Sequence, residues 1–523
     1  MTDEQPPSGK TMRYDRQLRL WGEAGQTALE NASVCLVNAT TYGCEILKNL
    51  ILPGVGEVHV VDQSPVTAND VQTNFFLAPG DIGKSRSEAV IQTLGQLNPE
   101  TKHRAYNMAL SEFVQTHMTD LKRFTVFIVS NVAPESFRDL AQIAWDSNIP
   151  VIVANIVGMY TETRVVVREH CVIESKPDNP LPDLRLDIPF TELIEFYQNI
   201  DLSVLNSTDH AHIPFVLILL KCLDQWKAAH GGEIPRNYKE KTLFKSLINK
   251  LRRKPDEENF NEACGMVNKC VVKTPLPSHL DDLFSDPSCT PSSTSTPFWL
   301  TAAAVKQFFT VRGVLPVSGT LEDMTADTQS FIALQTLYRD KARADSEVVA
   351  GYVAGFVTKH GFPPGYVGRD YISKFSRNSR YVRVLRTQPV ECPKDVVKEA
   401  VESFADDPVD LSHVFLLFQA CLEFVSANGR WPGDTEDNIP ADEVSLLAEL
   451  QGIQVKQDVS RCNPHLLVKD LVRFGGTEVP SVAAFSGGVA AHECIKLITC
   501  QYVPVDSCFV YSGGSQTTSV LKL

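Results

Sequence analysis

The stretch "VCLVNATTYGCEILKNLILPGVGEVHVVD", residues 34–62, predicts a strand, a tight turn, a helix and a second strand. The second strand ends on Asp62, and an acidic residue stands at this place in dinucleotide-binding units. The turn departs from those units, because the three glycine positions of a G-x-G-x-x-G motif hold Asn38, Thr40 and Gly43. The stretch therefore keeps the frame of a nucleotide site without its phosphate-binding turn.

The rest of residues 1–167 continues this alternation. The runs "FTVFIVS" (124–130) and "PVIVANI" (150–156) are short, apolar and rich in β-branched residues, whereas "SRSEAVIQTLGQLN" (85–98) has the spacing of an amphipathic helix. Strands that are apolar on both faces and alternate with helices predict a parallel sheet covered on both sides. We therefore expect an α/β, Rossmann-like domain.

The middle of the chain has a different character. Residues 168–478 contain long helical patterns such as "FIALQTLYRDKARADSEVVAGYVAGFV" (331–357), whereas the end reverts to a small-residue-rich helix and the strand-like "CFVYSGG" (508–514). We predict that a mostly helical insert, residues 168–478, interrupts the α/β domain and that residues 479–523 complete it.

Composition limits the classes of function. The 523 residues carry a formal net charge of −14, which argues against nucleic acid or an anionic membrane as the main partner. The start, "MTDEQPPSGK", lacks the apolar core of a signal peptide, and no apolar run reaches the ~20 residues that span a bilayer. The 13 cysteines form no C-x-x-C pair, so we expect no zinc site and reduced thiols in the cytoplasm or nucleus.

Besides the cysteines, two histidines in "DHAHIPF" (209–215) are the residues that could suggest a metal site. Their i, i+2 spacing keeps them off one helical face, so we predict a helix cap and a structural turn here, with no metal.

Several motifs together indicate a family. The segments "RYDRQLRLWG" (13–22), residues 34–62, "NFFLAPGDIGKSRSEAVIQTLGQLNP" (74–99), "GEIPRNYKEK" (232–241) and "GGVAAHECIKLIT" (487–499) closely resemble the adenylation domains of ubiquitin-activating enzymes. In heterodimeric members two such domains pair, and only one of them binds ATP with Mg²⁺. This chain resembles the non-catalytic half, and the likeness extends nearly from end to end.

The resemblance implies a degenerate nucleotide site. Relative to the active half, phosphate-binding glycines are replaced by Asn38 and Thr40, Ser64 stands where a second carboxylate is expected, and Thr73 takes the place of an arginine. Ala133 occupies the position of a metal-binding aspartate. We therefore expect this chain to bind no cofactor and no metal.

Two residues of the degenerate site keep their family identity. We expect Asp62 to be a hydrogen-bonded residue at a strand end and not a ribose ligand, and Gly43 to allow close packing of helix and strand.

The resemblance also implies the partners. They are a catalytic subunit that holds ATP and Mg²⁺, the ubiquitin-like modifier NEDD8 (also called Rub), and a conjugating enzyme reached through the complex. One alternative is the equivalent subunit of the SUMO-activating enzyme, although that protein has a much smaller insert. Alternatives of other classes are a stand-alone nucleotide-dependent enzyme and a pure adaptor.

One functional residue is retained in the "YDRQ" motif. In paired adenylation domains this arginine reaches across the interface towards the ATP phosphates of the partner, and its position here is Arg16. A planar guanidinium can bind phosphate with two hydrogen bonds. The alternative is a surface ion pair with Asp15. The family also implies that none of the eight cysteines of the insert, Cys171 to Cys462, is a catalytic nucleophile.

Overall fold

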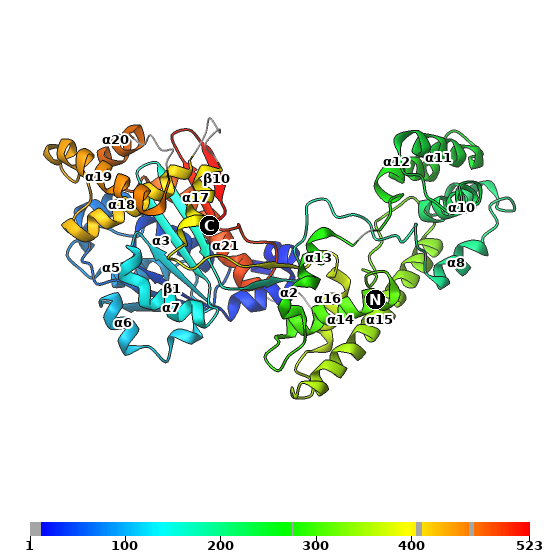
Figure 1. The fold of residues 1–523 in the computed structure, drawn as a ribbon, viewed down its shortest axis with the longest axis horizontal. Coiled ribbons are helices and arrows are strands. Elements are labelled where there is room, and N and C mark those ends of the chain that lie inside the picture. The colour runs from blue at the N-terminus through cyan, green and yellow to red at the C-terminus, as the bar shows by residue number, and fades with distance from the viewer. Residues whose placement is uncertain (1–11, 275, 404–410, 460–464) are drawn as a thin grey trace. The chain divides into compact units, whose positions relative to one another are not determined.

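The computed structural model describes residues 12–274, 276–403, 411–459 and 465–523. The chain divides into two compact units (Figure 1). Unit 1 comprises residues 1–172 and 384–523, and unit 2 comprises residues 173–383. The opening segment 1–11 and Cys462 lie outside the described residues.

Unit 1 is built on an eight-stranded sheet with the order β10-β9-β6-β5-β4-β1-β2-β3. Strands β1 to β5 run parallel to one another, whereas the pairs β5–β6, β6–β9 and β9–β10 are antiparallel. The strands are β1 (Ser33–Val37), β2 (Glu57–Val61), β3 (Lys102–Tyr106), β4 (Val126–Ser130), β5 (Val151–Val157), β6 (Tyr160–Val166), β9 (Cys508–Ser512) and β10 (Thr517–Leu521). The expected α/β class is confirmed, with a sheet that is mostly parallel.

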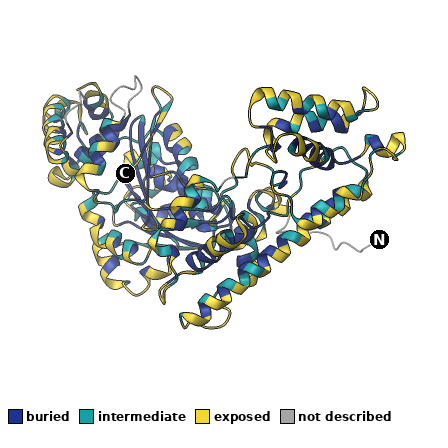
Figure 2. Ribbon diagram, turned by 45° about the vertical axis from the view of Figure 1, so that its right-hand side comes forward, coloured by how far each residue is buried: buried dark blue, intermediate teal, exposed yellow. Residues whose placement is uncertain are grey.

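Apolar side chains alternate between the two faces of this sheet, as the strand period of two requires. Leu36 of β1 packs in a core with α2, α3, α5 and α21, whereas Cys35 faces a second core that contains residues of α6 and α7. Figure 2 shows the strands as buried, with exposed residues on the outer sides of the helices. These helices are α2 (Asp15–Glu30), α3 (Thr41–Ile51), α4 (Ala68–Thr73), α5 (Arg86–Leu94), α6 (Leu110–Thr116), α7 (Arg138–Asp146) and α21 (Pro480–Thr499), with short 3₁₀ turns η1 (Pro79–Asp81), η2 (Leu121–Arg123) and η3 (Pro134–Phe137).

The described parts of residues 384–478 belong to unit 1, which differs from the predicted extent of the insert. Their helices share a core with the antiparallel strands, where Phe415 and Leu417 cluster with Val510 and Leu521. The apolar faces of β6, β9 and β10 need a cover, and these helices supply it. The elements are α17 (Lys394–Glu402), α18 (Ser412–Asn428), η5 (Glu436–Asn438), α19 (Ile439–Gln457) and α20 (His465–Arg473).

Unit 2 is helical, in agreement with the mostly helical insert that the sequence predicts. It contains α8 (Thr191–Gln198), α9 (Ser207–Ala211), α10 (Phe215–Ala229), α11 (Tyr238–Leu251), α12 (Glu258–Cys270), α13 (Ser278–Ser285), η4 (Pro287–Cys289), α14 (Pro297–Arg312), α15 (Thr328–Lys359) and α16 (Arg369–Asn378). The short strands β7 (His170–Val172) and β8 (Arg383–Leu385) pair where the chain passes between the units.

Candidate functional site

The residues that replace glycine in the β1–α3 turn use their side chains within the turn. Asn38 has a φ of 67°, a left-handed conformation that asparagine tolerates better than most residues, and its Nδ2 donates to the Ser130 carbonyl at 2.8 Å. Thr40 caps α3, because its hydroxyl accepts from the Gly43 N–H at 3.0 Å. The turn is therefore stabilised by side chains that lie where a phosphate would need bare backbone.

Gly43 brings α3 close to β1. A Cβ atom at this position would lie 2.7 Å from Cδ1 of Leu36, so only glycine allows the present spacing. Asp62, at the end of β2, is 6% exposed, and its carboxylate accepts from the Ala39 N–H at 3.0 Å and the Ser64 N–H at 2.8 Å. The Asp62 carboxylate thus accepts hydrogen bonds from two backbone N–H groups around the turn.

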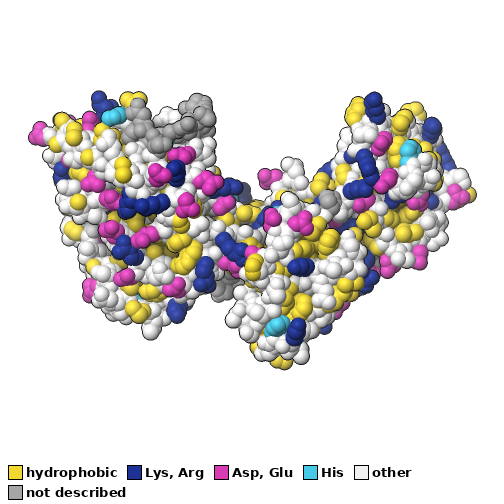
Figure 3. All heavy atoms as spheres, in the orientation of Figure 1, with side chains coloured by type: hydrophobic (Ala, Val, Ile, Leu, Met, Phe, Trp, Pro, Cys, Tyr) yellow, Lys and Arg dark blue, Asp and Glu magenta, His cyan; other side chains and the backbone are white. Residues whose placement is uncertain are grey.

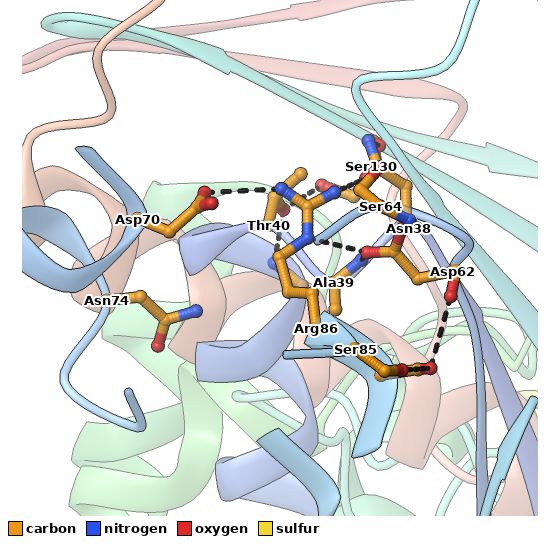
Figure 4. Close-up of polar contacts among 12 residues, drawn as sticks. Asn38, Ala39, Thr40, Asp62, Ser64, Asp70, Asn74, Ser85, Arg86 and Ser130 are labelled. Carbon is orange, nitrogen blue, oxygen red and sulfur yellow. Dashed lines mark hydrogen bonds and ion pairs between the residues drawn. The ribbon is translucent and has the colours of Figure 1, made fainter. Parts of the chain in front are cut away.

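Arg86 fills the centre of this site (Figure 4). Its guanidinium donates from Nε to Asp62 at 2.6 Å and from its two terminal nitrogens to Asp70 at 3.2 Å and Asn38 at 2.5 Å. Burial opposes the charge, but the two carboxylates outweigh it and raise the pKa of Arg86 above its ordinary value. A permanent cation of the chain itself therefore occupies this space.

Arg86 is not among the site residues that the sequence predicts. It is the first residue of α5, where the helix dipole disfavours a positive charge. An arginine at such a position needs a compensating acid, and this signal could have directed attention to Asp62 and Asp70.

Glu478 is a second residue that sequence reasoning missed. Its carboxylate accepts from the Tyr42 N–H at 2.8 Å and so lies at the N-terminal end of α3, where phosphate binds in nucleotide sites. Burial raises the pKa of Glu478 to about 7, although the Tyr42 hydrogen bond and Arg86 act in the opposite direction. The Asp62 and Asp70 carboxylates thus contact the guanidinium and Glu478 lies near the start of α3, so acidic groups that disfavour a phosphate line this part of the site.

The remaining degenerate positions supply neither a cation nor a metal ligand. Thr73 ends α4 and its hydroxyl lies 3.3 Å from that of Thr41. Ala133 precedes η3 and lines a cavity of about 700 Å³ together with Glu135 and Glu423. The residues of the site, taken together, do not fit a magnesium nucleotide.

Arg16 lies on the exposed face of α2, beside a firmly anchored residue. Tyr14 is buried and accepts a hydrogen bond from Asn98 at 3.1 Å, which fixes the start of the helix. Asp15 pairs with Arg19 at 3.0 Å. Within the described part of the chain Arg16 makes no hydrogen bond or ion pair, so the alternative pairing with Asp15 does not form here.

The two histidines of residues 209–215 contact different groups. Nδ1 of His210 lies 2.8 Å from the Glu257 carboxylate, and Nδ1 of His212 lies 2.7 Å from the Thr208 carbonyl. The cap of α9 is Asn206, so the motif itself lies in the last turn of α9 and the link to α10. Across the residues that the structure describes, no group of three or more His, Cys, Asp and Glu side chains could hold a metal ion.

The described cysteines of the predicted insert are poorly suited to nucleophilic chemistry. All seven are free thiols that are buried or partly buried, and burial raises the pKa of each. A raised pKa lowers the fraction of reactive thiolate at neutral pH. Among the described helices, none is long and apolar enough to cross a membrane.

Comparison with known proteins gives consistent matches over nearly the whole chain. A model of the ThiF family matches residues 14–522. The NEDD8-activating enzyme E1 regulatory subunit of Xenopus laevis is 38% identical over 98% of this chain and 99% of its own length. The regulatory subunit AXR1 of Arabidopsis thaliana is 34% identical over 98% of this chain and 96% of its own length.

More distant matches are consistent with these. The NEDD8-activating enzyme E1 regulatory subunit of Saccharomyces cerevisiae is 26% identical over 98% of this chain and 100% of its own length. Among solved structures, that of MccB from E. coli overlaps 29% of this chain and 44% of its own, with 19% identity and a TM-score of 0.26, which supports no further comparison.

Proposed function

The chain belongs to the ThiF family, and we infer that it is the regulatory subunit of a NEDD8-activating E1 enzyme. The observation that carries this conclusion is the end-to-end likeness to regulatory subunits, together with a nucleotide site that Arg86 fills. A regulatory subunit requires a catalytic partner. The matched relatives described above are named for NEDD8, which favours NEDD8 over the SUMO alternative.

The chemistry of activation would then belong to the partner. ATP and Mg²⁺ bind at the catalytic subunit, NEDD8 is adenylated there, and the conjugating enzyme is reached through the assembled complex. Support comes from Arg86 with its two carboxylate partners, Asp62 and Asp70, and from Glu478 at the start of α3, which together disfavour binding of phosphate at this chain's own site. The same features weigh against a stand-alone nucleotide-dependent enzyme. We place the complex in the cytoplasm and nucleus, in keeping with buried thiols such as Cys35, Cys222 and Cys421, which form no disulfide within the described residues.

Arg16 is this chain's contribution to the partner's ATP site. Two observations support this assignment: the guanidinium is exposed and uncommitted within the described residues, and the adjacent Tyr14 is buried and hydrogen-bonded. Such an arginine can bind phosphate in trans without help from its own subunit. Its presence also distinguishes this chain from a pure adaptor, which would need no phosphate-binding group.

Unit 2 has a separate task in this proposal. Residues 173–383 would shape, together with the cysteine domain of the catalytic subunit, the groove over which the modifier travels. The raised pKa values of the described cysteines in this unit fit a structural role.

Reconstitution tests the function. The purified chain is mixed with the catalytic subunits of the NEDD8 and SUMO enzymes, and ATP-dependent thioester formation is followed for each modifier. We expect a stable complex and charging of NEDD8 only in the NEDD8 pair. Formation of an active complex with the SUMO catalytic subunit would reject the assignment.

A further inference from the structure

Helix α11 of unit 2 carries an unusual concentration of positive charge. Residues 236–254, "RNYKEKTLFKSLINKLRRK", contain eight Lys or Arg and a single Glu, within a chain whose formal net charge is −14. Acidic residues follow only at the next turn, where Glu257 is buried against His210. Figure 3 shows dark-blue Lys and Arg side chains along the edge of the molecule where Figure 1 places α11.

Part of this charge is used inside the unit. Arg236 pairs with Glu233 at 2.6 Å, Arg252 donates to the Asn261 side chain at 2.5 Å, and Arg253 donates to the carbonyls of Leu202 and Ser203 at 2.6 and 3.0 Å. These contacts hold the ends of α11 in place.

The lysines on the solvent side of α11 have no such role. Lys239, Lys250 and Lys254 are exposed, and within the described residues their ammonium groups form no ion pair. Lys239, Leu243, Ser246 and Lys250 recur at helical spacing and so share one face. That face also exposes an apolar side chain, because Leu243 is 62% exposed. We call Lys239, Leu243, Ser246 and Lys250, together with Lys254, which lies three residues beyond the end of the helix, the α11 face.

The opposite side of the helix is committed to the core of unit 2. Phe244 and Ile248 are fully buried in a cluster with residues of α10 and α12. An interfacial membrane helix needs a free apolar side to enter the lipid, and α11 has none to spare. Nucleic acid offers phosphates but little for Leu243 to contact, and the net charge of the chain repels it.

We propose that the α11 face is a docking surface for an acidic segment of another protein, with apolar side chains interspersed among its carboxylates. Carboxylates would pair with Lys239, Lys250 and Lys254, while an apolar side chain covers Leu243 and excludes water from the contact. Electrostatic attraction of this kind raises the association rate and depends strongly on salt.

The test uses the reconstituted heterodimer and fluorescence anisotropy of a labelled peptide made of Glu-Glu-Leu repeats. The reversal variant Lys239→Glu/Lys250→Glu should bind roughly tenfold more weakly at low salt, because two attractive pairs become repulsive. The control Arg312→Glu/Lys359→Glu carries the same charge change on α14 and α15 and should bind as the wild type does. Leu243→Ser should weaken binding of this peptide but not of polyglutamate.

These side chains lie away from the core that Phe244 and Ile248 join, so the variants should fold, and NEDD8 charging measured in parallel separates loss of docking from loss of the proposed activity. Added salt should weaken binding to the wild type but not to the reversal variant, in which screening reduces the new repulsion. The proposal is overturned if the wild type does not bind the peptide, if the reversal and control variants weaken binding equally, or if single-stranded DNA or phosphatidylserine vesicles bind more tightly than the peptide.

Discussion

Arg86→Ala should destabilise unit 1 substantially. The substitution leaves Asp62 buried without its cation and removes one hydrogen bond each from Asp70 and Asn38. Breaking a buried ion pair from one side typically costs 3–5 kcal/mol, and Asp62 retains two backbone donors, so we expect about 3 kcal/mol. For a unit of this size that corresponds to a fall in Tm of roughly 6 °C.

Calorimetry and urea unfolding of the chain measure this loss. Arg86→Lys keeps the charge but cannot reach three acceptors with a planar fork, so its Tm should lie between those of Ala and wild type. Low concentrations of guanidinium, well below denaturing levels, should restore part of the Tm of Arg86→Ala by occupying the vacated space. Arg104→Ala removes an exposed arginine from β3 and serves as the control. Equal Tm values for Arg86→Ala and Arg104→Ala would refute the reasoning.

The remaining predictions concern three other residues of unit 1. Because the pKa of Glu478 is raised to about 7, its contribution to stability is fully present below the ordinary glutamate pKa and is lost as pH rises through about 7. Glu478→Gln should therefore flatten the fall of Tm between pH 5 and 8, and an unchanged slope would count against the environment described for Glu478. Arg16→Ala should leave the heterodimer intact but slow pyrophosphate exchange by roughly 10- to 1,000-fold, since this arginine only helps to hold the leaving pyrophosphate. Arg16→Lys should restore part of the rate, because lysine keeps the charge but not the planar shape. An unchanged rate in Arg16→Ala would show that Arg16 is a surface residue without a role at the ATP site. Gly43→Ala should cost about 1–3 kcal/mol in urea unfolding, because the new Cβ would overlap Leu36, and the same substitution should cost less when it is made in a Leu36→Ala background. Full stability of Gly43→Ala would show that the helix can shift freely.

The parallel half of the sheet could be read from the sequence because its strands are apolar on both faces. The predicted runs at 124–130 and 150–156 correspond to β4 and β5, and the helix expected near Gly43 is α3. The hydropathy pattern does not predict strand β6, because Glu162 and Arg164 give its sequence a polar character. Both are buried. Glu162 accepts from Asn155, and the terminal nitrogens of Arg164 donate to the Pro389 and Val390 carbonyls, which are distant in sequence, whereas the Arg164 Nε has no partner among the described residues.

In the candidate site, too, the local features were predictable from the sequence and the long-range contacts were not. Local motifs identified Asn38 and Thr40 as obstacles to phosphate, and the structure places both in the turn with their side chains engaged. The groups that fill the site come from elsewhere: Arg86 follows Asn38 by 48 positions and Glu478 follows Tyr42 by 436. A local signal such as an arginine at the start of a helix shows that an acidic partner is needed, but it does not identify the partner, because folding of the chain brings the two together. The predicted insert, residues 168–478, is longer than unit 2, residues 173–383, because helical periodicity does not reveal which core a helix joins.

The most direct test of the account is the number of ATP molecules bound per heterodimer, measured by calorimetric titration with Mg-ATP. We expect one binding site per heterodimer, contributed by the catalytic subunit, and no measurable heat of binding for the isolated chain. Two sites per heterodimer, or micromolar affinity in the isolated chain, would contradict the claim that Arg86 and the carboxylates around it close this site to nucleotide.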